Sequence, residues 1–210
     1  MTQVAAAPLT LDALDEQTRL LVRLSAVVTA GTEAEQRVAI AAALGVVPDL
    51  WVEELLLQSY LFAGFPRTLN AMREWRRVHP LAVAPPASGS PSEWREAGER
   101  TCAVVYGRFY ERLRENIRDL HSALDDWMIE EGYGKVLSRS GLDLPRRELC
   151  IVAACAAAGQ DRQLHSHLHG ALNAGVVAAV LTETLQSLDD LIGGDRLETA
   201  RMLWARVQGK

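Results

Sequence analysis

The sequence contains few of the residues that would cross-link it covalently. Its 210 residues include only three cysteines, Cys102, Cys150 and Cys155, and so small and odd a number does not suggest a disulfide framework. Cys150 and Cys155 lie five residues apart in one helix-like run, where their side chains would point about 140° apart. They could pair only if a helical turn unwound. We therefore expect all three to be small core residues.

The sequence also lacks basic blocks, long apolar runs and a signal peptide, which restricts the partners and the compartment that we expect for this protein. The net charge is −5 and no block of lysine or arginine occurs, so we expect no nucleic-acid partner. No apolar run reaches the roughly 20 residues of a membrane span, so we expect no membrane partner either. The opening MTQVAAAPLT lacks the charged and apolar regions of a signal peptide. We therefore expect a cytoplasmic protein.

The sequence also lacks the apolar–polar alternation that is typical of strands. Apolar residues recur instead at helical spacing, and helix signals are frequent: Thr32 and Glu35, for example, form a capping box. We predict an all-α protein. Its first helix is expected over residues 10–30, and a single long charged helix over residues 109–131.

Two parts of the chain resemble each other at an offset of about 128 residues. Residues 57–75 and 185–204 share Leu-Gln-Ser, a glycine, an arginine and a terminal tryptophan. Residues 80–92, PLAVAPPASGSPS, are rich in proline and serine, which is typical of a linker. The predicted organisation is a degenerate helical repeat at 1–79, this linker, and a second repeat at 93–210.

Most of the reactive side chains are concentrated in residues 146–175, which are predicted to form a helical hairpin. Glu148 lies near the positive end of the first helix dipole. His165, His167 and His169 lie on the second helix. His165 and His169 share one face and could hold a metal ion between them, but no third ligand is evident on that face. We therefore predict no metal site.

The order of motifs in this hairpin resembles the carboxymuconolactone decarboxylase family: R-E-L, an alanine-rich run, Q-L-x-x-H, then A-L-N-x-G. In the related D-type alkylhydroperoxidases, a glutamate is followed twelve residues later by C-x-x-C and then, four residues on, by a histidine. Counting from Glu148 places these positions at Gln160, Gln163 and His167. The acid and the histidine match, whereas both thiol positions are glutamine. The match favours the decarboxylase branch, in which Q-L-x-x-H is usual.

This resemblance implies an alkylhydroperoxidase-D-like helical fold in two unequal tandem repeats. It also implies a cofactor-free lyase or isomerase that acts on a small carboxylated lactone or related acid. Glu148 and His167 would be the catalytic pair that handles the proton. Arg147, Gln163 and His165 would bind the anionic substrate.

Two other functions stay open. The first repeat has Leu20 and Ala39 where the second has Glu148 and His167, so any chemistry is confined to the second repeat. Such drift also fits a non-catalytic, oligomeric binding or structural member of the family. A thiol-dependent alkylhydroperoxidase fits less well without C-x-x-C. Single-repeat relatives form rings of six, so the resemblance implies a homo-oligomer, a trimer of this two-repeat chain, or a dimer if the unequal repeats limit closure.

Overall fold

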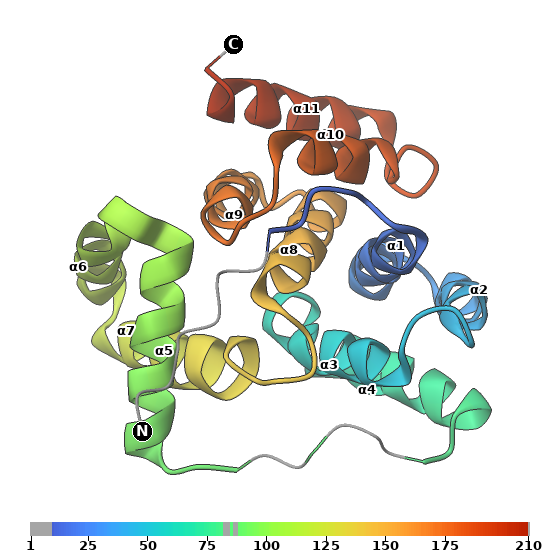
Figure 1. Cartoon of the computed structure of the whole chain (residues 1–210), viewed down its shortest axis with the longest axis horizontal. Helices are drawn as coiled ribbons and strands as arrows, with labels where there is room; N and C mark the ends of the chain where they lie inside the picture. Colours follow the sequence, from blue (N-terminus) through green and yellow to red (C-terminus); the bar gives the residue numbers. More distant parts are fainter. Residues whose placement is uncertain (1–9, 82–84, 86–87, 210) are drawn as a thin grey trace.

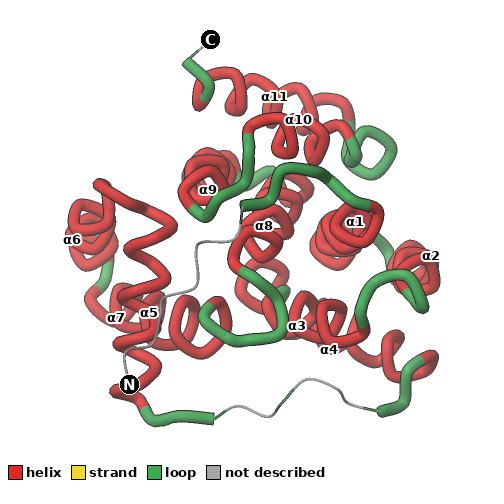
Figure 2. The backbone as a smooth tube through the Cα atoms, viewed as in Figure 1, coloured by secondary structure: helices red, strands yellow, loops and turns green. Residues whose placement is uncertain are grey.

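The structure, a computed structural model, describes residues 10–81, 85 and 88–209. Within these ranges every regular element is helical, apart from one isolated bridge that pairs Leu11 with Val176 (Figure 2). The predicted all-α class is confirmed. None of the helices in the described ranges has the length and apolar character needed to cross a bilayer. Part of the predicted linker, residues 82–84, 86 and 87, lies outside the described residues.

Two sets of four helices follow each other along the chain (Figure 1). The first set comprises α1 (Glu16–Ala30), α2 (Glu33–Ala43), α3 (Asp49–Gln58) and α4 (Tyr60–Val78). The second set comprises α8 (Leu144–Ala158), α9 (Asp161–Asn173), α10 (Ala178–Gln186) and α11 (Gly194–Val207). Helices α1 and α8 both begin after an aspartate N-cap, Asp15 and Asp143, which are 128 positions apart in the chain. The helix starts thus follow the offset of the sequence repeat, while the domain boundaries themselves remain a prediction.

The remaining helices connect the two sets. They are α5 (Pro91–Tyr106), the 3₁₀ turn η1 (Gly107–Phe109), α6 (Tyr110–Leu120), α7 (Ser122–Trp127) and the π-helical segment η2 (Met128–Leu137). Helix α5 begins with a capping box between Ser90 and Glu93, with Pro91 in its first turn. It crosses η2 at very short range, since a Cβ atom on Gly98 would come within 2.1 Å of the Ile129 carbonyl oxygen.

Helix α8 lies at the centre of the molecule, with α1 on one side and α9 on the other (Figure 1). Every residue from Leu149 to Ala157 is buried. A helix that is apolar on all sides belongs in the interior of a protein, because it has no face suited to water. Ser25 of α1 donates a hydrogen bond of 2.7 Å to the Cys150 carbonyl oxygen, so α1 packs against the backbone of α8.

The single helix predicted over residues 109–131 is wrong. Helix α6 ends at Leu120, and His121 adopts an extended conformation whose ring accepts a hydrogen bond from the Ala123 amide. The chain then turns back, so that Arg114 donates to both carboxylate oxygens of Asp125. Eleven residues of straight helix would separate these two positions by about 16 Å. The first predicted helix also starts later than expected, at Glu16.

A buried ion-pair cluster joins the first helix set to the start of α8. The Glu54 carboxylate accepts hydrogen bonds from Arg147 at 2.8 Å and from Arg139 at 2.7 Å. Both Glu54 and Arg147 are fully buried. Arg147 also donates to Gln58 at 3.1 Å and to the Leu142 carbonyl oxygen at 3.0 Å, so hydrogen bonds to buried groups hold its guanidinium in the interior. Breaking one member of such a cluster leaves a buried charge without its partner.

We expect Arg147→Ala to lower the free energy of unfolding by about 3–5 kcal/mol, because the substitution removes the fully buried partner of Glu54, leaves only Arg139 to neutralise that carboxylate, and removes the hydrogen bonds to Gln58 and Leu142. Denaturant titration measures the effect. Arg37→Ala is the matched control, since Arg37 is half exposed and its ion pair with Glu74 spans 3.6 Å. That variant should lose no more than about 1 kcal/mol. Equal stability of the two variants would show that Arg147 is free for another role.

Candidate functional site

The site is centred on an ion pair between Glu148, in the first turns of α8, and His167 of α9. The His167 Nδ1 atom lies 2.8 Å from Glu148 Oε2. Glu148 is fully buried and His167 is 5% exposed. Nineteen residues separate them, and the hairpin of α8 and α9 brings them together. An ionised carboxylate can only accept, so the shared hydrogen then belongs to Nδ1. The other nitrogen, Nε2, makes no hydrogen bond to any described residue.

The second carboxylate oxygen of Glu148 has no partner. Oε1 is buried and lacks a hydrogen bond in the part of the chain that the structure describes. An unsatisfied buried polar atom costs about 1–3 kcal/mol, so folds rarely keep one without a functional reason. Glu148 therefore combines one oxygen that orients a histidine with another that can accept a hydrogen bond from a further molecule.

Gly170 creates the space for this carboxylate. A Cβ atom at this position would lie 2.6 Å from Glu148 Oε2 and 2.7 Å from a methyl group of Val105. Only glycine lets α9 approach α8 and α5 this closely, so any larger residue would push Glu148 away from His167. Gly170 lies three residues after His167, on the neighbouring part of the same helix face.

Aromatic rings surround the imidazole. Phe62 of α4 meets the His167 ring edge-on at a centroid distance of 5.7 Å, and Tyr106 of α5 lies at 6.4 Å. Tyr133 of η2 packs against Tyr106 at 6.2 Å. Burial raises the pKa of both tyrosines, and the Glu148 charge adds to this effect, so their hydroxyl groups stay protonated. No sequence motif indicated these three rings, although Phe62 lies within residues 57–75, which resemble residues 185–204.

The three thiols are buried and free, as predicted. Burial, with a smaller contribution from the nearby Glu148 charge, raises the pKa of Cys102 and of Cys155 to about 12. Burial also raises the pKa of Cys150. The nucleophilic form of cysteine is the thiolate, so these side chains are unreactive thiols at neutral pH.

The three predicted substrate-binding residues lie in different surroundings. Arg147 is fully buried against Glu54, and a substrate could reach its guanidinium only by displacing that carboxylate. Gln163 lies one turn before His167 and is exposed. His165 lines a separate cavity together with His169, on another face of α9. Substrate binding by Gln163 and His165 therefore stays a prediction.

The positions in the first helix set that correspond to Glu148 and His167 are apolar. Leu20 and Ala39, the counterparts of Glu148 and His167, line an apolar groove of about 310 Å³. Val38, also on this groove, is 71% exposed. The acid–histidine pair of the second set is thus replaced by an aliphatic surface in the first.

The part of the chain that contains this site is similar to known proteins. Residues 123–206 match the carboxymuconolactone decarboxylase family, a range that includes α8 to α11. Over 132 residues the chain is 30% identical to Peroxisomal protein 2 of Schizosaccharomyces pombe (strain 972 / ATCC 24843). The aligned part makes up 59% of this chain and 60% of that protein, so the chain spans less than two thirds of this relative. The residues that match the carboxymuconolactone decarboxylase family model include both members of the buried Glu148–His167 pair.

Proposed function

We propose that the chain is a cofactor-free lyase or isomerase in which Glu148 and His167 transfer a proton on a small carboxylated lactone or a related acid. The observation that carries this proposal is the buried pair with its 2.8 Å contact and its one unpartnered carboxylate oxygen. Histidine changes its protonation near neutral pH, which suits it to both halves of a proton transfer.

In the lyase reaction the bond between the carboxyl carbon and the ring carbon breaks, and carbon dioxide leaves. The electron pair of that bond passes into the conjugated system toward the lactone carbonyl. Protonated His167 delivers its Nε2 proton to carbon, and a proton from water then restores it. Glu148 stabilises the imidazolium before the transfer and holds the Nδ1–H tautomer afterwards.

In the isomerase reaction the Nε2 atom of His167 carries no proton at the start. Neutral His167 removes a proton from carbon at Nε2 and returns it at another carbon of the conjugated system, so no group leaves. Phe62 and Tyr106 lie beside the imidazole. Their apolar faces would keep water from the charged intermediate.

A non-catalytic binding or structural role is the second candidate. The apolar groove at Leu20 and Ala39 favours it, since one of the two equivalent places has lost its titratable pair. Burial of all three cysteines leaves a thiol-dependent peroxidase the least supported function. We keep the cytoplasm as the proposed compartment, with the peroxisome, named in the relative's description, as the alternative.

Glu148→Gln and His167→Ala should each reduce turnover by about 10²–10⁴-fold, because each removes one member of the proton-handling pair. The assay follows carbon dioxide release and ultraviolet absorbance for a panel of unsaturated lactone carboxylates. Circular dichroism confirms that each variant is folded. Wild-type rates in both variants would rule out the proposed chemistry.

A variant with Cys102, Cys150 and Cys155 all replaced by alanine should keep its turnover largely intact, because the buried thiols are not nucleophiles. The same variant is assayed with organic hydroperoxides. Hydroperoxide turnover by the wild type that disappears in this variant would instead support the peroxidase.

We also propose that the chain assembles as a homo-oligomer, with a trimer favoured over a dimer. The exposed groove around Leu20 and Val38 supplies apolar surface that a partner chain would cover. Multi-angle light scattering at micromolar concentration should give three times the mass of one chain. The mass of a single chain under these conditions would contradict the assembly.

A further inference from the structure

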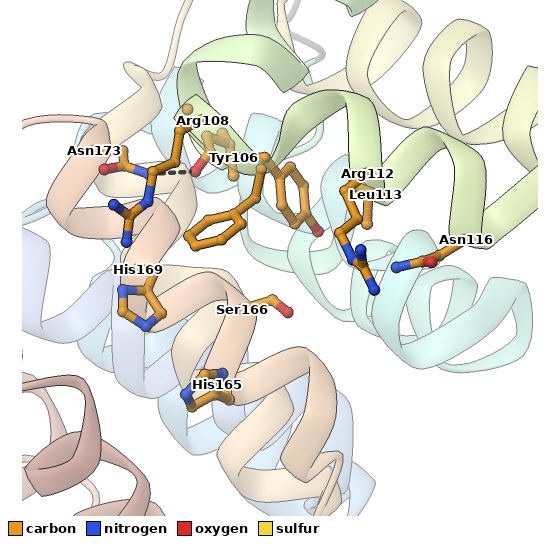
Figure 3. A pocket seen from close by; sticks show the side chains of 12 residues that line it. Tyr106, Arg108, Arg112, Leu113, Asn116, His165, Ser166, His169 and Asn173 are labelled. Carbon is orange, nitrogen blue, oxygen red and sulfur yellow. Dashed lines mark hydrogen bonds between the residues drawn. The ribbon is translucent and has the colours of Figure 1, made fainter.

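The most spacious of the cavities described lies away from the Glu148–His167 pair. It has a volume of about 770 Å³ and is enclosed by the end of α5, η1, α6 and one face of α9 (Figure 3). His165 and His169 are on this face, one turn apart, whereas His167 points to the other side of the helix. Val105, beside Gly170, stands between the two sites.

The upper wall of this cavity carries two arginines whose charges are not neutralised. Arg108 of η1 extends toward His169 of α9, and Arg112 of α6 lies near Asn116 (Figure 3). Neither forms an ion pair with any described residue, and no aspartate or glutamate lines the cavity. Other arginines, such as Arg114 and Arg147, hold carboxylates. A guanidinium without an acidic neighbour is suited to binding an anion from solution.

The opposite wall adds polar groups but no negative charge. The rings of His165 and His169 are 5.1 Å apart, edge to face. Burial lowers the pKa of His169, and the positive charges of His165 and Arg108 lower it further. In the described ranges no third histidine, cysteine or acid joins the two rings to complete a metal site. The surroundings therefore favour an anion over a cation.

Part of the cavity is apolar. Phe109 and Leu113, which follow the two arginines in the chain, line it, and Phe109 is 52% exposed, which is high for so large a ring. The Arg108 guanidinium carbon lies 4.8 Å from the centre of the Phe109 ring, so a positive group and an aromatic face adjoin. A ligand that fills this space needs both a negative head and an apolar body.

We propose that this cavity binds an organic carboxylate with an apolar body. Arg108 and Arg112 hold the carboxylate, His165 and His169 contribute further hydrogen bonds, and Phe109 and Leu113 pack against the body of the ligand. The site is separate from the proton-transfer pair and does not depend on the proposed reaction, because it is defined by binding alone.

Isothermal titration calorimetry with 2-naphthoate tests the proposal. We expect one molecule to bind per chain, and the neutral analogue 2-naphthylmethanol to bind at least tenfold more weakly. Raising the salt concentration should weaken naphthoate binding, because charges on an open surface are screened. Equal affinity for the two compounds, or no binding of naphthoate, would overturn the proposal.

Variants locate the site. Arg108→Gln with Arg112→Gln should weaken naphthoate binding at least tenfold, and Arg112→Gln alone should weaken it by a smaller factor. Both arginines are exposed, so the fold does not depend on them. Arg19→Gln, an exposed arginine on α1, is the matched control and should bind as the wild type does. Equal weakening in the control would overturn the assignment.

One more variant separates this site from the proposed reaction. His167→Ala should leave naphthoate affinity unchanged, whatever it does to turnover. Loss of naphthoate binding in His167→Ala, with full binding in the double arginine variant, would place the ligand at the proton-transfer pair and contradict the proposal. Loss of turnover without loss of binding leaves this site intact.

Discussion

The buried ion pair between Glu54 and Arg147 fixes the start of α8, and the rest of the structure depends on how α8 is placed. Arg147 and Glu148 are neighbours in the chain but point to different sides of the helix. Arg147 is held by α3, while Glu148 faces α9 and holds His167. Because successive residues of a helix are about 100° apart, anchoring the first side chain sets the direction of the second. The candidate site is thus oriented from the first half of the chain.

The two halves also complete each other. Phe62, which follows α3, packs on the His167 ring in the second helix set. Asp190, which is 128 positions later and follows α10, pairs with Arg23 of α1 in the first set at 2.6 Å. Each set therefore places a side chain against a helix of the other, Phe62 against α9 and Asp190 against α1.

Much of the fold could be predicted from the sequence, because helical spacing, caps and the repeat are local or periodic signals. The capping boxes at Thr32 and Ser90 are two examples. The break at His121 could not be predicted, because the ion pair between Arg114 and Asp125 that accompanies it joins two separate helices. The motif spacing correctly brought Glu148 and His167 together. The family resemblance also implied that Arg147 binds the substrate. The sequence does not show that Glu54, far away in the chain, forms an ion pair with this guanidinium.

The long-range pairing has a consequence for how the chain reaches its native state. Glu54 and Arg147 are separated by 93 residues, and Arg23 and Asp190 by 167. Helices form within about a microsecond, but contacts of this kind require large loops to close first. During synthesis Glu54 leaves the ribosome long before Arg147 exists, so this carboxylate has to wait for α8 before the pair can form. Although the described elements are helical, the folding rate of this protein should therefore depend on the meeting of its two halves, as it does in proteins of high contact order.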